Sequence, residues 1–545
     1  MADCQTGGDE KIGRLKARLR RSRNRFPFAE TEFMKLPKSL FFSGSALLLG
    51  ACQSLPDLSQ RSVSTYIDTE SSPRLEAALP SERPSEKETG QTGVYLLADP
   101  HDAFVARAIL IGHADHTLDI AYYIWHDDVS GKMLFQMLQQ AARRGVRVRL
   151  LLDDNNTRGM DDTLAALDAE ENIEIRLFNP FTHRKFRALG YLTDFPRLNR
   201  RMHNKSLTAD NRYAIIGGRN VGDEYFNVST ETGFADLDVL AKGAVVTDIS
   251  RDFDRYWASG SSYPFAAVAK HANAEKGRLK IRQSRKKDAP IRESYLDDLE
   301  NAPLAAAVSA GKVPWIYTDA QLVSDDPAKG LSRSREKPSV ADKLLETLGK
   351  PQQDLFIVSP YFVPSKWGME ALRGITAKGV GVTVLTNSLR ATDVAAVHSG
   401  YARYRKDLLK AGVELYEVKP DFAPPKAKDK GLTGSSATSL HAKTFVVDGK
   451  RVFIGSLNFD PRSARLNTEM GIVLDSPEIA ADMRQELRQM APEYAYKVIL
   501  DPKGRRLRWQ DPDRPGEILK NEPDAGLWKR LFSNILSLFP IEKLL

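Results

Sequence analysis

The chain carries the stretch His-Asn-Lys-Ser-Leu-Thr-Ala-Asp at residues 203–210 and a matching stretch, His-Ala-Lys-Thr-Phe-Val-Val-Asp, at residues 441–448. Both keep the pattern His-x-Lys-x-x-x-x-Asp, and they begin 238 residues apart. A pattern that returns at a fixed distance indicates a duplicated unit. The sequence therefore predicts a fold built from two similar halves.

The same offset of 238 residues relates further identical residues without a gap. After the three motif residues it pairs Gly217 with Gly455, Asn220 with Asn458, Glu231 with Glu469, and Gly233 with Gly471. Core packing selects apolar side chains, so it does not explain a register of mostly polar identities. We therefore expect the two halves to share a functional site as well as a fold.

Around the motifs, apolar β-type runs alternate with helical patterns, which is typical of α/β proteins. The first half has strand-like runs at 118–125, 146–153 and 173–178 with a helix at 131–144, and the second has strand-like runs at 354–364, 381–387 and 413–418 with helices near 366–378 and 400–410. We predict two α/β lobes related by internal duplication and packed face to face around one active site. The expected boundaries are lobe 1 at 93–265, a charged linker at 266–312, lobe 2 at 313–500 and a C-terminal extension with an amphipathic helix at 501–545.

The N-terminal part has the features of an export and lipidation signal. Residues 34–51 combine a short basic start with an apolar run too short to span a membrane, and Leu49-Gly50-Ala51-Cys52 resembles a bacterial lipobox. This predicts a leader at 1–52 with a signal peptide at 34–51, lipidation of Cys52, and Met34 as the true start. The Ser, Pro and Glu-rich segment 53–92 is expected to be a disordered tether.

Composition limits the remaining possibilities. The formal net charge is +8, but residues 1–51 carry ten Lys/Arg against five Asp/Glu, which leaves +3 for the rest of the chain. A nucleic-acid partner is therefore not expected. The only cysteines are Cys4 and Cys52, so the main body has no disulfide, thiolate metal site or catalytic thiol, and we expect neither metal nor cofactor.

Each half thus contains His-x-Lys-x-x-x-x-Asp, then Gly-[Gly/Ser]-x-Asn, then Glu, and in this it resembles the phospholipase D superfamily. Residues two apart on a strand point to the same face, so His203 lies beside Lys205 and His441 beside Lys443. Lobes packed face to face would place two imidazoles and two ammonium groups around one phosphate. Lysines neutralise its oxygens, and a neutral imidazole can attack phosphorus near pH 7.

The resemblance implies roles for the site residues. His203 is the expected nucleophile and His441 the general acid that later acts as base, although near symmetry leaves the opposite assignment open. Glu231 and Glu469 would accept a hydrogen bond from the far ring nitrogen of a histidine. The remaining candidates either bind the phosphate and shape its loop (Asn220, Asn458, Gly218, Ser456) or orient the motif (Asp210, Asp448).

Three features favour a phospholipid substrate. The first is the expected anchor at Cys52. The second is a C-terminal helical pattern that places Trp528, Leu531, Phe532, Ile535, Leu538 and Phe539 on one face beside Lys529 and Arg530, as in an interfacial helix, although a helix docked on the core fits equally. The third is resemblance to bacterial cardiolipin synthases of the C-type branch, carried by residues 361–364, 458–463, 466–469 and 539–545.

That resemblance implies a phosphatidyltransferase that moves a phosphatidyl group onto phosphatidylglycerol, with phosphatidylglycerol or phosphatidylethanolamine as donor. The expected location is a bacterial membrane, inner or outer, and Arg184, Lys185, Arg187, Arg197, Arg200 and Arg201 either hold anionic headgroups or form an ordinary solvated loop. The main alternative is a phospholipid hydrolase. A nuclease and a non-catalytic membrane-binding module fit the sequence less well.

Overall fold

The computed structural model of the chain describes residues 55–80, 90–228, 232–331, 338–420 and 437–537. The chain divides into two units, Met1–Ser54 and Leu55–Leu545, and all described residues belong to the second. The predicted signal peptide and Cys52 lie outside the described residues, as do Glu231, Leu538 and Phe539.

Lobe 1 is built on a mixed sheet in which only the central strands run parallel. Its strands lie in the order β1 (Thr92–Leu97), β8 (Asp238–Gly243), β6 (Tyr213–Gly217), β5 (Ser206–Ala209), β2 (Thr117–Tyr122), β3 (Arg147–Asp153), β4 (Ile173–Phe178) and β9 (Ser262–Pro264). The pairs β2–β3 and β3–β4 are parallel and the other neighbours antiparallel.

Lobe 2 repeats this order. Its strands are β10 (Ile316–Ser324), β17 (Met470–Asp475), β16 (Arg451–Gly455), β15 (Thr444–Val447), β11 (Asp354–Val358), β12 (Gly381–Asn387), β13 (Val413–Val418) and β18 (Ala495–Leu500). Here too the parallel pairs are the central ones, β11–β12 and β12–β13. The shared order confirms the internal duplication.

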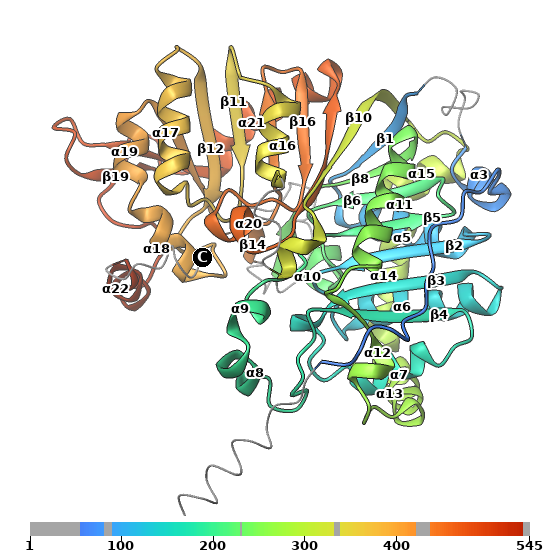
Figure 1. Cartoon of the computed structure of the whole chain (residues 1–545). Helices are drawn as coiled ribbons and strands as arrows, with labels where there is room; N and C mark the ends of the chain where they lie inside the picture. The colour runs from blue at the N-terminus through green and yellow to red at the C-terminus, as the bar shows by residue number, and fades with distance from the viewer. Residues whose placement is uncertain (1–54, 81–89, 229–231, 332–337, 421–436, 538–545) are drawn as a thin grey trace, which may run out of the picture. The chain divides into compact units, whose positions relative to one another are not determined.

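The two sheets join at one edge and pack against each other. Strand β1 pairs with both β8 and β10, so the lobes form one continuous sheet (Figure 1). A buried apolar cluster takes side chains such as Val239 and Ala241 from lobe 1 and Val446 and Ile454 from lobe 2. This cluster holds the lobes face to face, because every second residue of a strand points to the same side.

Helices cover both sheets. In lobe 1, α5 (Pro100–His113), α6 (Val129–Arg143) and α7 (Asp161–Asp168) pack on the outer face, and α11 (Ala244–Trp257) packs on the inner one. In lobe 2, α16 (Val340–Leu348), α17 (Ser365–Thr376), α18 (Ala395–Ala402) and α19 (Arg405–Lys410) are outer and α21 (Pro477–Tyr494) is inner. Caps fix where two of these helices begin: Asp128 accepts from Gly131 N–H at 3.0 Å, and Ser339 forms a capping box with Asp342.

Between the lobes, the predicted charged linker is helical and lies on lobe 1. It contains α12 (Phe265–Val268), α13 (Ala274–Lys287), α14 (Ala289–Glu300) and α15 (Pro303–Ser309). Tyr295 is buried and its hydroxyl donates to the Phe226 carbonyl at 2.9 Å. The linker is therefore a layer of lobe 1 rather than a free connection.

The prediction of a disordered tether at 53–92 is wrong for residues 55–80, and β1 begins at Thr92, the last residue of that predicted segment. Arg61 donates to three backbone carbonyls of lobe 1 at 2.6 to 2.9 Å. Helix α3 (Pro73–Ala78) follows, and Leu75 and Leu79 are fully buried against α5. Composition predicted disorder because apolar residues are few, yet a few anchors order a segment when a neighbouring lobe supplies their pockets.

The C-terminal extension continues lobe 2. Strands β19 (Leu507–Gln510) and β20 (Ile518–Leu519) extend the sheet beyond β18, so lobe 2 does not end at residue 500. Helix α22 (Leu527–Leu536) then lies beside α18, where the Ser399 and Ser533 hydroxyls are 3.1 Å apart. Among the described residues, no helix combines the length and apolar character that crossing a membrane requires.

Candidate active site

Each His-x-Lys motif is held by the backbone of the opposite lobe. The N–H of His203, just before β5, donates to the carbonyl of Thr468 at 2.9 Å. The N–H of His441 donates to the carbonyl of Ala235 at 2.8 Å, where β14 (Ala437–Leu440) pairs with β7 (Thr232–Ala235). The lobes therefore exchange main-chain contacts at the point where both motifs lie.

A carboxylate from the opposite lobe also holds each histidine ring. Nδ1 of His203 lies 2.8 Å from Oε2 of Glu469, and Nδ1 of His441 lies 2.5 Å from Oδ2 of Asp236. Both histidines and both carboxylates are buried. Engaging Nδ1 in this way fixes the ring orientation and leaves Nε2 as the nitrogen for chemistry.

Asp236, the partner of His441, shows that the two halves do not align without a gap over their whole length. Backbone register matches Gly217 to Asp238 in lobe 1 and Gly455 to Gly471 in lobe 2, an offset of 233 rather than 238 residues. By the same count, Asp236 is the structural equivalent of Glu469. The pairings of Glu231 with Glu469 and Gly233 with Gly471 were therefore wrong, because lobe 1 has five extra residues after Asn220.

The two lysines lie against their own motif histidines. Lys205 Nζ donates to the carbonyl of His203 at 2.7 Å, and Lys443 Nζ donates to the carbonyl of His441 and lies 2.9 Å from its Nδ1. Burial lowers the pKa of Lys205 to about 7 and that of Lys443 to about 8. These buried cations form a site that an anion would stabilise.

Electrostatics also connects the two half-sites. Burial and the charges of Lys205, Lys443 and His441 all lower the pKa of His203 well below its ordinary value. A charge effect of this kind requires the groups to be near one another in a dry environment. Together with the hydrogen bonds that each motif histidine makes to the opposite lobe, these effects place both histidines and both lysines in one site.

The two histidine–carboxylate pairs are not equivalent. Burial raises the pKa of Glu469 to about 7, although Lys205 opposes the shift. The pKa of Asp236 instead lies well below its ordinary value, because His441 and Lys443 outweigh the effect of its burial. Asp236 is therefore the stronger partner for a positively charged imidazole.

Asp210 and Asp448 face away from the histidines, at the far ends of β5 and β15. Asp210 accepts from the N–H groups of residues 115, 116 and 117 at 2.7 to 2.8 Å. Asp448 accepts from those of residues 352, 353 and 354 at 2.7 to 3.1 Å. Both have positive φ, 52° and 54°, which suits a turn that joins two strands.

The Gly-[Gly/Ser]-x-Asn segments line the same region. Asn220 accepts from Ile124 N–H and donates to the Tyr225 hydroxyl at 2.9 Å, so part of its amide is already engaged. Asn458 is buried, and its Oδ1 has no hydrogen-bond partner among the described residues. Ser456 donates to Glu469 at 2.5 Å, whereas a Cβ on Gly218 would lie 2.2 Å from Asp236.

Aromatic rings enclose both histidines. Tyr123 packs edge-on against His203 with ring centroids 4.9 Å apart, while Tyr225 and Phe234 lie 5.3 and 5.1 Å from His441. Tyr361 donates to Asp393 at 2.7 Å, and the charge of Asp393 partly opposes the lowering of the Lys443 pKa by burial. Sequence reasoning did not assign these residues to the site, because an isolated aromatic residue is more often part of a core.

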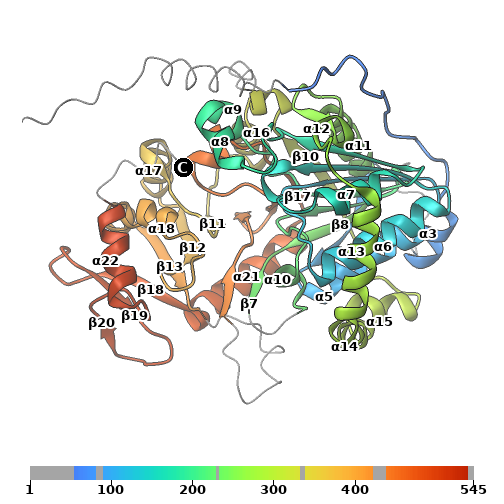
Figure 2. The ribbon, with the colours of Figure 1, turned by 90° about the horizontal axis from the view of Figure 1, so that it is seen from below.

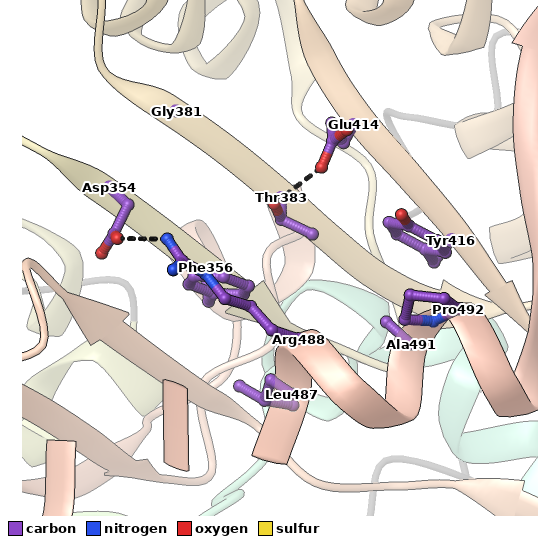
Figure 3. Close-up of a pocket in the computed structure, with 10 residues that line it drawn as sticks. All are labelled: Asp354, Phe356, Gly381, Thr383, Glu414, Tyr416, Leu487, Arg488, Ala491 and Pro492. Atoms are coloured by element: carbon purple, nitrogen blue, oxygen red, sulfur yellow. Dashed lines mark hydrogen bonds and ion pairs between the residues drawn. The ribbon is translucent and has the colours of Figure 1, made fainter. Parts of the chain in front are cut away.

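Two other features were tested as sites. His126, Asp128 and Glu224 are the one group among the described residues whose geometry could hold a metal ion, but all three are partly exposed, and an ion pair of 3.2 Å between His126 and Glu224 accounts for the contact. A cavity of about 190 Å³ between the lobe 2 sheet and α21 is lined in part by Arg488, which bonds to Asp354 at 2.9 Å (Figure 3). It contains neither motif histidine.

Comparison with known proteins points to one family. Residues 108–257 and 344–491 match the family described as "Cardiolipin synthase, PLD-like domain". The chain is 48% identical over 479 residues to cardiolipin synthase C of Escherichia coli, covering 87% of this chain and all of that one. It is 26% identical to cardiolipin synthase A of Pseudomonas entomophila over 72% of this chain and 67% of that one.

A solved structure shares the fold. The phosphatidylserine synthase of Haemophilus influenzae superposes with a TM-score of 0.53 at 12% identity, covering 83% of this chain and 94% of that one. At this identity the likeness concerns the fold alone.

Proposed function

Since the chain belongs to the phospholipase D-like cardiolipin synthase family and is a phosphatidyltransferase, we propose that it transfers the phosphatidyl group of one phospholipid to phosphatidylglycerol through a phosphohistidine intermediate. One observation carries the proposal. Two buried histidines from different lobes, each held at Nδ1 by a carboxylate of the other lobe, lie beside two buried lysines.

In the first step, Nε2 of His203 attacks the phosphorus of the donor lipid. The N–P bond forms as the P–O bond to the headgroup alcohol breaks, and His441 gives its proton to the departing oxygen. Lys205 and Lys443 stabilise the charge on the remaining phosphate oxygens. We also assign phosphate contacts to Asn220 and Asn458.

In the second step, a glycerol hydroxyl of phosphatidylglycerol replaces the headgroup alcohol. His441, now neutral, takes the hydroxyl proton, the new O–P bond forms, and the N–P bond to His203 breaks. The product is cardiolipin, and both histidines return to their starting protonation states.

The unequal pairs favour His203 as the nucleophile. A nucleophile must be neutral, and the surrounding cations and burial keep the pKa of His203 low. A general acid must hold a proton. Burial and Lys443 lower the pKa of His441, but the ionised Asp236 opposes that shift and stabilises the protonated ring, whereas no such carboxylate effect offsets the lowering at His203. We assign Asp210 and Asp448 to the architecture of the motif turns rather than to the reaction.

The finer features of the function are also proposals. We propose phosphatidylglycerol or phosphatidylethanolamine as donor, attachment to a bacterial membrane through a lipidated Cys52, and α22 as an interfacial helix. The exposed side chains of α22 support its role as an interfacial helix, because Trp528 is 80% exposed and Phe532 is 55% exposed. The competing function is hydrolysis, in which water takes the place of the acceptor hydroxyl.

Transfer and hydrolysis give different products. Purified chain incubated with phosphatidylglycerol, alone and with phosphatidylethanolamine, should form cardiolipin detectable by mass spectrometry. Phosphatidic acid as the main product would instead favour the hydrolase, and cleavage of single-stranded DNA without lipid turnover would favour a nuclease.

An activated donor separates the roles of the two histidines. A phosphatidyl ester of p-nitrophenol has a leaving group that needs no proton, so His441→Ala should release one equivalent of p-nitrophenol and retain the phosphatidyl adduct on His203. His203→Ala should give no such burst. A burst in His203→Ala with the adduct on His441 would establish the opposite assignment.

A further inference from the structure

The segment 183–199, which leads directly into His203, presents little of the positive charge that its sequence suggested, because Lys185 alone among its lysines and arginines is exposed. Its arginines and the adjacent Arg200 and Arg201 bond internally, so neither a headgroup site nor a solvated basic loop describes them. Arg184 pairs with Asp154 at 2.6 Å, and Arg197 pairs with Asp194 at 2.6 Å. The others bind Asp154, Asp153 or the carbonyls of Lys329 and Arg465.

Instead, this segment presents apolar side chains to the outside. It forms α8 (Arg187–Thr193) and α9 (Phe195–Leu198). Gly190 packs toward Phe181 and Leu198, while the opposite side of the segment exposes Phe186 (69%), Leu189 (47%), Leu192 (82%) and Phe195 (46%). The polar groups thus anchor the segment to lobe 1 and its apolar groups point outward, the reverse of an ordinary surface helix.

Helix α22 of lobe 2 has the same organisation. Ser533 faces α18, and the outer side exposes Leu527 (76%), Trp528 (80%), Leu531 (47%), Phe532 (55%) and Ile535 (46%). The helix contains Lys529 and Arg530 and no acidic residue. Both elements thus combine an exposed apolar face with little acidic charge of their own, since Asp194 between α8 and α9 pairs with Arg197 and α22 contains no acidic residue.

Both elements also connect to the active site. In Figures 1 and 2, α8 and α9 lie between α22 on one side and α6, α7 and α13 on the other. The chain runs from α9 to His203 in five residues. On the other lobe, Lys529 donates to the carbonyls of Arg390 and Thr392, next to Asp393, which bonds Tyr361.

We propose that α8–α9 is a membrane-contact element that acts together with α22, so that each lobe inserts one apolar element into an anionic phospholipid bilayer beside the shared site. This rests on the proposed lipid function and specifies how the site meets its substrate. Two separate protruding faces with aromatic and aliphatic tips fit a bilayer, since acyl chains accept apolar groups at any spacing and anionic headgroups attract Lys185, Lys529 and Arg530.

The test uses the full chain and vesicles made of equal parts phosphatidylethanolamine and phosphatidylglycerol. Leu192→Asp and Trp528→Asp should each weaken vesicle binding on the order of tenfold, and the double variant should weaken it further. Leu279→Asp is the matched control, because Leu279 is 53% exposed on α13, away from both elements. A urea unfolding midpoint for each variant establishes that the fold is intact.

Activity measured in two substrate forms separates this inference from the proposed function. The variants should lose turnover on vesicles but keep it on a short-chain, monomeric phospholipid. Vesicle binding unchanged in Leu192→Asp, or reduced equally in Leu279→Asp, would overturn the membrane role of α8–α9. A wild-type chain that binds vesicles but transfers no phosphatidyl group in either form would contradict the proposed function and leave the docking inference standing.

Discussion

Replacing Asp236 by Asn should slow phosphatidyl transfer far more than replacing Glu469 by Gln, although both carboxylates hold the Nδ1 of a histidine. Asp236 is ionised and lies 2.5 Å from His441, whose protonated form must persist until the headgroup departs. Two unit charges separated by roughly 4 Å at an effective dielectric constant of about 20 interact by about 4 kcal/mol. Loss of that interaction corresponds to about a thousandfold decrease in kcat.

Glu469 contributes less charge at neutral pH. Because its pKa is raised to about 7, Glu469 is partly protonated at neutral pH. Its partner His203 is neutral before attack and becomes positively charged only as the N–P bond forms. Glu469→Gln keeps the hydrogen-bond acceptor, so we expect a loss of roughly tenfold to a hundredfold.

The measurement is kcat for cardiolipin formation in detergent-mixed micelles at pH 7, with KM determined alongside. KM should change little, because the charge acts mainly in the transition state. Asp236→Glu serves as the conservative control and should recover part of the loss. Equal losses in the two amide variants, or a greater loss in Glu469→Gln, would refute the reasoning and favour His441 as the nucleophile.

Three further predictions follow from the geometry. The kcat/KM profile should fall on the alkaline side between about pH 7 and 8, because the Lys205 and Lys443 ammonium groups lose their protons as pH rises through those values. The kcat profile should fall at higher pH, since a bound phosphodiester raises both lysine pKa values. If kcat and kcat/KM fell over the same pH range, the role of the lysines would be contradicted. Gly218→Ala should lower kcat by more than about tenfold, because the new Cβ would lie 2.2 Å from Asp236 and displace it; unchanged kinetics would show that the carboxylate position does not matter. Asp210→Ala should reduce the free energy of unfolding in urea by about 3 kcal/mol or more, since three N–H groups lose a charged acceptor, while kcat of the folded enzyme changes less than tenfold.

The sequence predicted the regular elements well where apolar runs are continuous. The strands at 381–387 and 413–418 have the predicted bounds, and the repeated strand order follows from the duplicated pattern. Buried parallel strands are apolar on both faces, so they leave an unambiguous signal. The sequence predicted the positions of the two motifs equally well, because His, Lys and Asp keep a fixed spacing in both halves.

The partner of His441 was missed because an ungapped comparison rewards coincident identities. Glu231 matched Glu469 at the common offset, whereas Asp236 required five extra residues and a different acid. The available signal was the register of strand β8, in which Asp238 corresponds to Gly471 of β17, two residues after Glu469. Aligning the strands rather than the letters would have placed Asp236.

The sequence did not identify which residues meet across the lobes. The resemblance implied that Glu469 accepts a hydrogen bond from a histidine, but not that this histidine is His203 of the other lobe. Nothing local in the sequence indicates that Arg61 anchors the N-terminal segment to the end of α11. Likewise, composition shows the arginines of 184–201 but not the carboxylates that pair with them or the carbonyls that accept their hydrogen bonds. Such contacts depend on tertiary proximity, which the local sequence pattern does not encode.

The differences between the half-sites also explain how a duplicated site can perform two unlike tasks. In lobe 2, the Ser456 hydroxyl bonds Glu469, whereas in lobe 1 the equivalent Gly218 leaves no room for a side chain beside Asp236. Each small residue therefore belongs with its own acid, so exchanging one member alone should disturb the half-site more than exchanging both. An ionised aspartate on one histidine and a partly protonated glutamate on the other give the two imidazoles different proton affinities within the same pocket. A lower proton affinity on one imidazole suits a nucleophile and a higher one suits a general acid, so the difference fits the roles proposed for His203 and His441.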